Sequence, residues 1–443
     1  MNIPWNRLFK LTPEATWVFV GQAGTAVAGL AGIKLLTHVL TPSEFGRLAL
    51  ANTIVALIGT NVFGSLGQGV MRFWAISKNR GDLDIFYSVS TRYARYAIYI
   101  VSSFTIISTP FLLLKGINWV VLLTLSLIVG AVTGWLGLRI SVFTAARKRK
   151  QIALLNIGNA FLRPVIAVFL VILIASDASW AMVGYLLATF LILLIAERLY
   201  RHTVSETSSS TIELDKAAFS SKNLSKEIFS FSWPSLVWGI FGWVYMSSDR
   251  WALQTFYGAE VVGAFAVVSQ LAVYPLIFGS GFLSTLFTPI AFQRVGDLTS
   301  HHNIISANKL LGVMTGIYVL GAVILISLFF LFHHSLVLLI SNAQYAKLSF
   351  LLPWLTAAWG LFYLGQVLAT FGMLANNPKI YIMPKLVSAI VAGISTFYLA
   401  STIGPVGVVW GLATAGFVYA LWCSVIAWKV VVGLQKGRLA NTT

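Results

Sequence analysis

Charged residues and cysteine are both scarce in this sequence. Only 10% of its 443 residues are charged, and the acidic residues number just 13. Soluble domains carry about a quarter of their residues as Asp, Glu, Lys and Arg. The single cysteine, Cys423, cannot form an internal disulfide. These shortages exclude an ordinary soluble protein and leave Cys423 as a small apolar residue of the last predicted helix.

Long polar segments and the motifs of nucleotide or metal binding are missing as well. Few polar stretches are long, so a large catalytic domain outside a membrane is excluded. No glycine-rich phosphate loop occurs, which argues against ATP hydrolysis by this chain. The histidine pairs His301-His302 and His333-His334 lack the i, i+4 spacing and the nearby carboxylates of a metal site. We therefore expect no cofactor and no bound metal.

Apolar residues dominate what is present. They make up 58% of the chain, and the mean hydropathy is +0.84. About 20 such residues in a helix cross a bilayer, and a sliding window finds twelve candidate spans. The first is interpreted as an uncleaved membrane helix, because its apolar run is longer than the core of a signal peptide. The predicted spans are 16–37, 47–71, 96–114, 118–143, 153–175, 178–198, 229–248, 260–287, 309–332, 350–375, 380–400 and 404–430.

The basic residues fall mainly in alternate loops. If both termini are cytoplasmic, 24 of the 30 Lys and Arg residues lie on the cytoplasmic side and four on the outer side. The remaining two, Lys34 and Arg163, lie within spans. This bias follows the positive-inside rule, and it accounts for the net charge of +17 without a nucleic-acid partner.

A serine- and threonine-rich stretch divides the chain into two halves. We predict an N-terminal bundle over 1–200, a cytoplasmic linker over 201–228 and a C-terminal bundle over 229–443. Laying 41–51 over 258–268 aligns Gly46 with Gly263 and makes the span starts at 16 and 233 coincide. Six helices per half means that both halves begin on the same side, so the repeats are parallel. The predicted fold is an all-α membrane protein, with about twelve transmembrane helices in two parallel-repeat six-helix bundles around a central cavity.

Several loose motifs resemble those of a known transporter family. The chain resembles the polysaccharide (oligosaccharide) flippase family, a member of the multidrug/oligosaccharidyl-lipid/polysaccharide exporter superfamily, over nearly its whole length. None of the motifs is a catalytic signature, so the resemblance assigns no role to a single residue. The motifs are Leu40-Thr41-Pro42-Ser43-Glu44-Phe45-Gly46, Leu66-Gly67-Gln68-Gly69-Val70-Met71-Arg72-Phe73, Ser248-Asp249-Arg250, Phe256-Tyr257-Gly258 and Val262-Gly263-Ala264-Phe265-Ala266.

The resemblance implies an alternating-access transporter and not an enzyme. Its substrate would be an undecaprenyl-pyrophosphate-linked oligosaccharide, moved from the inner to the outer leaflet of the bacterial inner membrane for surface polysaccharide synthesis. Transport would be driven by an ion gradient or by removal of the substrate on the far side. The expected partners are the lipid-linked oligosaccharide, membrane lipid, and the glycosyltransferases and glycan polymerase of the same pathway.

Arg163 is the strongest candidate for contact with an anionic cargo. It lies about ten residues into the fifth span, hence about 15 Å deep. A guanidinium at that depth costs roughly 2.5–3.5 kcal/mol unless it faces water, a partner or a ligand. Asn156 and Asn159 share its helix face at i, i+3, i+7 spacing, and Pro164 follows it. The structural alternative is an arginine that helix carbonyls or these asparagines satisfy within the bundle.

Other polar residues within the spans are candidates for lining a cavity. Lys34 lies late in the first span, where its side chain can also reach the outer interface. The sequence places Asp249 alone among the acids within a span and puts the others, Glu197 included, in loops or at helix ends. Asp249 and Arg250 are either outer-mouth residues or a helix-end ion pair. Amides either line a hydrophilic lumen or join helices, and they are Asn61, Gln68, Gln22, Gln270 and Gln366.

Two other functions remain open at this point. A cation or drug antiporter on the same scaffold would need carboxylates at membrane depth, which the sequence places only at Asp249. A membrane glycan polymerase or ligase would need a long outer loop with catalytic groups, and the longest predicted outer loop, 333–349, is short. Both are therefore less favoured than the flippase.

The charge bias predicts a definite topology. Reporter fusions after Arg80, Lys150, Lys222 and the C-terminus should report the cytoplasm, because basic loops are retained there. Fusions near Lys115, Asp177 and His334 should report the outside. Reversal at two or more of these seven sites would contradict the twelve-span arrangement.

Overall fold

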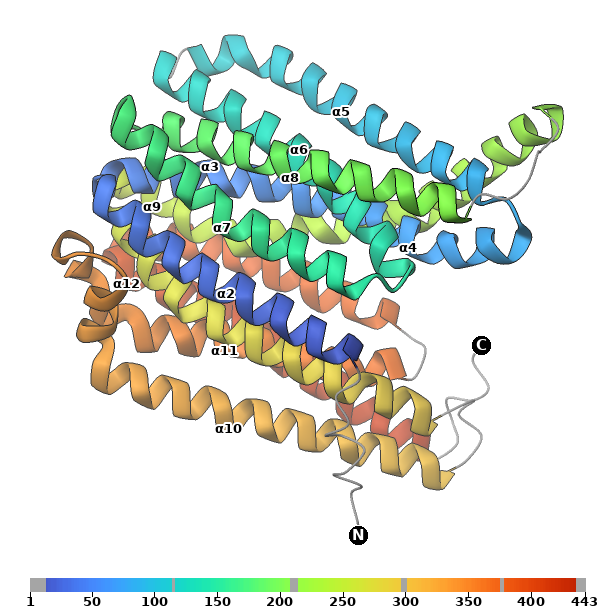
Figure 1. Ribbon diagram of the computed structural model, residues 1–443. Helices are drawn as coiled ribbons and strands as arrows, with labels where there is room; N and C mark the ends of the chain where they lie inside the picture. Colours follow the sequence, from blue (N-terminus) through green and yellow to red (C-terminus); the bar gives the residue numbers. More distant parts are fainter. Residues whose placement is uncertain (1–12, 114–115, 208–213, 296–300, 375–377, 436–443) are drawn as a thin grey trace. The chain divides into compact units, whose positions relative to one another are not determined.

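The computed structural model describes residues 13–113, 116–207, 214–295, 301–374 and 378–435, which form helices joined by short connections. These described residues contain no β-strand. The basic residues Arg7, Lys10 and Lys115 and part of the predicted linker, 208–213, lie outside them. The helices are α2 (Pro13–Val39), α3 (Pro42–Ala56), the π-helix η1 (Leu57–Val62), α4 (Phe63–Arg80), α5 (Leu83–Leu113), α6 (Ile117–Ala145), α7 (Arg149–Leu173), α8 (Ala178–Thr207), α9 (Leu214–Val295), α10 (His301–Ile340), the 3-10 helix η2 (Ala343–Leu351), α11 (Leu352–Leu374), the 3-10 helix η3 (Pro378–Tyr381) and α12 (Ile382–Gln435) (Figure 1).

Within the described residues, nine helical segments are long and apolar enough to cross a membrane. Two of these segments, in α9 and α12, run for 72 and 55 residues and contain a break, so each provides two crossings. The 31-residue helix α5 covers most of the predicted span 96–114 but is not one of these nine segments. The chain is thus a multi-pass, all-helical membrane protein, as the sequence predicts.

Glycine marks the breaks inside the two longest helices. Gly258 in α9 has φ 78° and Gly404 in α12 has φ 71°, a left-handed conformation that glycine adopts without steric penalty. Pro405 follows the second break and cannot donate a backbone hydrogen bond to the preceding turn. The second crossing starts differently, because Thr41 caps α3 with its hydroxyl and Pro42 occupies the first turn.

The described residues form two compact units that divide between Trp243 and Val244. We call 13–243 the N-terminal unit and 244–435 the C-terminal unit. The first part of α9, Leu214–Trp243, therefore belongs to the N-terminal unit, although the sequence prediction assigns 229–243 to the second bundle. Leu224 and Ile228 are buried in the same hydrophobic core as residues of α4, α5, α6 and α8.

Small residues bring α2 and α7 into close contact within the N-terminal unit (Figure 1). A Cβ atom added at Gly24 would lie 2.7 Å from Ile157, and one at Gly32 would lie 3.0 Å from Pro164. The contacts advance along both helices in the same direction, so α2 and α7 run parallel. That direction is expected for the first and fifth crossings of an alternating topology.

Stacked aromatic rings fill part of the core of the C-terminal unit. Tyr245 of α9 stacks on Phe362 of α11 at 4.3 Å between ring centres, and Phe362 stacks on Tyr419 of α12 at 5.3 Å. Trp359 meets Tyr245 edge-on at 5.6 Å. Edge-to-face and offset-stacked rings of this kind stabilise a helix contact beyond the area that they bury.

Candidate functional site

Arg163 lies at the meeting point of three helices in the N-terminal unit. Its Nε donates a hydrogen bond to the Thr189 hydroxyl of α8 at 2.9 Å, and a terminal guanidinium nitrogen donates to the Thr133 hydroxyl of α6 at 2.5 Å. The guanidinium carbon lies 5.6 Å from the centre of the Tyr185 ring. We call these four residues the Arg163 cluster.

The Arg163 cluster contains a positive charge without an acidic partner. Among the ion pairs of the described residues, none involves Arg163. Neutral hydroxyls and an aromatic face stabilise a guanidinium less than a carboxylate does, because they carry no formal negative charge that would neutralise it. The hydrogen-bond partners of the guanidinium are therefore hydroxyls rather than the carbonyls or asparagines of the structural alternative.

Two of the predicted cavity amides, one on α7 and one on α2, carry a buried oxygen without a hydrogen-bond partner among the described residues. Asn156 and Asn159 are both partly buried. Asn159 Oδ1 and Gln22 Oε1, on the neighbouring helix α2, are buried acceptors with no hydrogen-bond donor among the described residues. Buried acceptors normally have a donor, and a sugar hydroxyl or water can supply one. These two amides remain predicted cavity residues.

Lys34 lies at nearly the same depth as Arg163. Gly32 is packed against Pro164, and Lys34 is two residues further along α2, a rise of about 3 Å. The side chain of Lys34 is exposed, whereas that of Arg163 is partly buried. The N-terminal unit thus carries two cations close to one level of the neighbouring helices α2 and α7.

The second-crossing amides differ in their surroundings. Asn61 lies in η1, where its Nδ2 donates to the carbonyl of Ala56 at 3.2 Å. The side-chain amide nitrogen of Asn61 is therefore already bonded to a backbone carbonyl one turn earlier in the same crossing. Gln68 is exposed on α4. Gln68 is thus open to a ligand, while Asn61 has a local structural function.

The predicted polar residues of the C-terminal unit bond mainly to neighbours within that unit. The Tyr274 hydroxyl donates to Gln270 at 3.4 Å, and Gln366 donates to the Tyr419 hydroxyl at 3.1 Å. Asp249 is fully buried, and its Oδ1 accepts the backbone N–H of Arg250 at 2.7 Å. Within the described residues, Asp249 Oδ2 and Arg250 Nε have no hydrogen-bond partner, so the two side chains do not form the helix-end ion pair considered above.

A second buried charge cluster was missed by the sequence analysis. Arg139 of α6 is only 3% exposed, and its Nε donates to Glu197 Oε1 of α8 at 2.6 Å. The Trp135 indole donates to the same oxygen at 2.6 Å. The guanidinium also lies 3.7 Å from the centre of the Tyr200 ring. This pair joins α6 to α8 by a charge-assisted bond that neutralises both ions.

The prediction that Glu197 lies at a helix end is therefore wrong. α8 continues for ten residues beyond it to Thr207, and Glu197 is within the membrane-length segment Ala178–Val204. The sequence placed the end of the sixth span at 198, one residue past Glu197, so the acid was counted as terminal. Arg139 compensates this charge, whereas Arg163 has no ion-pair partner among the described residues.

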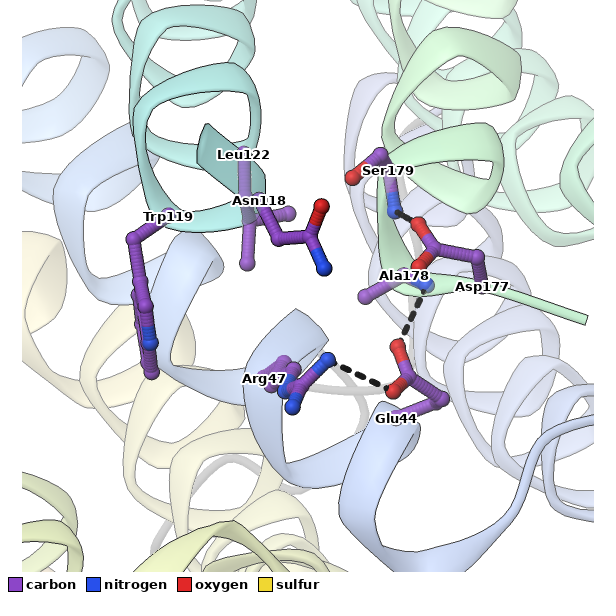
Figure 2. Close-up of a pocket in the computed structure, with 8 residues that line it drawn as sticks. All are labelled: Glu44, Arg47, Asn118, Trp119, Leu122, Asp177, Ala178 and Ser179. Atoms are coloured by element: carbon purple, nitrogen blue, oxygen red, sulfur yellow. Dashed lines mark hydrogen bonds and ion pairs between the residues drawn. The ribbon is translucent and has the colours of Figure 1, made fainter. Parts of the chain in front are cut away.

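A small pocket lies where α3, α6 and α8 meet at the connection before α8 (Figure 2). Glu44 links two of these helices, since its carboxylate accepts from Arg47 at 2.9 Å and from the backbone N–H of Ala178 at 2.9 Å. Asp177 accepts from the Ser179 N–H at 2.6 Å. Figure 2 shows both carboxylates turned toward the start of α8, where they cap unpaired N–H groups. The pocket therefore lies at a packing contact between helices. Glu44 of the Thr-Pro-Ser-Glu motif holds α3 against the start of α8 there.

Solved structures with the same fold are membrane transporters. The chain is similar to the eukaryotic MATE transporter AtDTX14 (TM-score 0.68, 14% identity, covering 98% of this chain and 99% of that chain). It is similar to the lipid II flippase MurJ in an inward closed conformation (TM-score 0.66, 10% identity, covering 96% of this chain and 90% of that chain). It is also similar to a MOP superfamily transporter from Pyrococcus furiosus Vc1 (TM-score 0.61, 16% identity, covering 97% of this chain and 99% of that chain). At these identities the likeness establishes the fold.

The chain is thus a multi-pass, all-helical membrane protein with the fold of these transporters. Residues 11–293 match the family described as polysaccharide biosynthesis protein, and the chain belongs to that family. Comparison with curated protein sequences gives no significant match. This match confirms the family resemblance noted in the sequence.

The Arg139–Glu197 pair predicts a measurable loss of stability. Glu197→Ala leaves a buried guanidinium without its carboxylate, which costs about 3–5 kcal/mol in a buried pair. We expect a clear drop in the thermal unfolding midpoint of the purified protein in detergent. Glu227→Ala is the matched control, because the Arg80–Glu227 pair is exposed and such pairs contribute about 0–1 kcal/mol. Equal midpoints for the two variants would contradict a structural function of Glu197.

Proposed function

We propose that this protein moves an undecaprenyl-pyrophosphate-linked oligosaccharide from the inner to the outer leaflet of a bacterial inner membrane, with both termini in the cytoplasm. The observation that supports this proposal most directly is the Arg163 cluster. Its guanidinium is bonded to two neutral hydroxyls, and no ion pair of the described residues includes it. A pyrophosphate is the anionic part of such a substrate and can replace these weaker partners.

Binding of the head group would follow from the chemistry of the two cations. Arginine presents a planar fork that matches two phosphate oxygens, and lysine offers a point charge. Arg163 would hold one phosphate while Lys34, at nearly the same depth, attracts the second. Acceptor amides such as Asn159 and Gln22 are suited to sugar hydroxyls, which donate hydrogen bonds. The polyprenyl tail would stay in the surrounding lipid.

Movement would use the two halves of the chain. In transporters with parallel repeats, a site at depth opens alternately to either side as one bundle rocks against the other. Differential binding by the cluster supplies the selectivity, since only a ligand that contacts one state better can shift the balance between states. The polymerase and glycosyltransferases of the pathway are proposed partners that would consume and supply the substrate.

The antiporter alternative has one observation in its favour. Asp249 is a fully buried carboxylate whose Oδ2 has no partner among the described residues. A cation could bind there. The uncompensated arginine in the other unit favours an anion, however, and we therefore place the flippase first.

A genetic experiment separates these functions. Deletion should make lipid-linked glycan accumulate at full repeat-unit length on the cytoplasmic leaflet, with loss of the surface polymer. If repeat units instead reach the outer leaflet unpolymerised, the chain acts as a polymerase. Raised sensitivity to cationic drugs with unchanged glycan would show an antiporter.

Substitution of Arg163 tests the binding site itself. Arg163→Ala should lose most transport with normal membrane insertion, because the only uncompensated charge of the cluster is removed. Arg163→Lys should retain part of it, since a point charge still attracts a phosphate. The measurement is surface polymer restored in a deletion strain, with Arg95→Ala, an exposed arginine of α5, as the control. Full restoration by Arg163→Ala would exclude this residue from transport.

A further inference from the structure

The first part of α9 packs lengthwise against the second crossing. The Trp243 indole donates to the carbonyl of Thr53 in α3 at 2.7 Å. Gly239 lies against Asn61 in η1, where an added Cβ would be 3.1 Å from the Asn61 side-chain oxygen. Arg72 of α4 lies over the Phe231 ring at 4.8 Å. We call this contact, from Thr53 to Arg72, the α9 seam.

The middle of the α9 seam is a π-helix. η1 spans Leu57–Val62, halfway along the second crossing, and the N–H of Phe63 bonds to the carbonyl of Ile58 five residues back. Such one-turn π segments are rare and occur frequently at functional sites. Two side chains bond to the backbone around its start, because Asn61 donates to Ala56 and Trp243 to Thr53. One of these donors comes from α9.

The opposite side of η1 contacts the Arg163 cluster. A Cβ added at Gly59 would lie 3.1 Å from Thr133 Cγ2 and 3.3 Å from the carbonyl oxygen of Gly130. Thr133 is the hydroxyl acceptor for the Arg163 guanidinium. η1 is therefore in contact with the cluster through Gly59 and with α9 through Asn61, two residues further along.

We propose that η1 is the positioning element that couples ligand binding at Arg163 to movement of α9. When an anion binds the Arg163 guanidinium, it replaces the Thr133 hydroxyl as the acceptor. Thr133 then loses its hydrogen bond to Arg163 and can move relative to Gly59. A π-helix holds one residue more per turn than the α-helix on either side of it, so a shift to α-helical geometry turns Asn61 away from Gly239. In this proposal the π-helix and the α-helical form of η1 are the two discrete arrangements that coupling requires.

The movement has a covalent route to the other unit. α9 continues from Trp243 into Val244 and the residues of the C-terminal unit, with its first non-helical residue at Gly258. A rotation of the α9 seam therefore acts on a helix that both units share. This coupling rests on the proposed anion site at Arg163.

Two substitutions on α9 test the coupling. Gly239→Ala places a methyl group against Asn61, and Trp243→Phe keeps the ring but removes the donor to Thr53. Both should leave binding of undecaprenyl pyrophosphate to the purified protein unchanged while lowering transport, for Gly239→Ala by about tenfold, equivalent to ~1.4 kcal/mol. Gly64→Ala is the matched control, because nothing lies within 4 Å of a Cβ at that position in α4.

The outcomes separate this inference from the proposed function. Binding retained with transport lost in Gly239→Ala and Trp243→Phe, and both retained in Gly64→Ala, supports the coupling. Wild-type transport in both seam variants overturns it, and so does a parallel loss of binding and transport, which indicates only a structural contact. If Arg163→Ala also binds undecaprenyl pyrophosphate as the wild type does, the proposed function fails instead.

Discussion

A guanidinium inside a membrane-spanning helix has to be compensated, and the surroundings of Arg163 do this only in part. Carboxylate compensation is available elsewhere in the same unit, where Glu197 neutralises Arg139 at 2.6 Å. At Arg163 the partners are the hydroxyls of Thr133 and Thr189 and the face of Tyr185. The difference between these two arginines separates a structural ion pair from a site with unused positive charge. An unused charge at this depth is expensive, and it is retained where it serves an ion or a substrate.

The packing around this charge depends on small residues. Gly24 and Gly32 let α2 approach α7, Gly59 lets η1 approach Thr133, and Gly239 lets α9 approach Asn61. Close backbone approach of this kind replaces the hydrophobic driving force that is missing between helices in lipid. It also makes the contacts sensitive to single methyl groups. The cluster, the π-helix and α9 therefore form one continuous set of contacts within the N-terminal unit.

The fold class could be predicted from the sequence, and most of the surroundings of Arg163 could not. Hydropathy identifies the spans, and depth together with the Asn156/Asn159 spacing identifies Arg163. Threonine in the middle of a helix has no distinctive pattern, so Thr133 and Thr189 could not be chosen as its partners. The sequence analysis placed Glu197 at a helix end because a sliding hydropathy window does not locate the end of a span to within a few residues. The π-helix was not predicted either, because Leu57–Val62 lies inside the predicted span 47–71 and hydropathy does not distinguish a π-helical turn from an α-helical one. Packing between helices decides these features.

The most direct test of the account is the leaflet distribution of lipid-linked oligosaccharide in vesicles that contain only the purified protein. A lectin or periodate added outside would report how much of the glycan becomes accessible with time. The account predicts protein-dependent exposure of the pyrophosphate-linked glycan, with most of the rate lost in vesicles carrying Arg163→Ala and little change for an uncharged lipid-linked glycan of equal size. Equal rates for charged and uncharged lipid carriers, or for Arg163→Ala and the wild type, would contradict the claim that this arginine selects an anionic substrate.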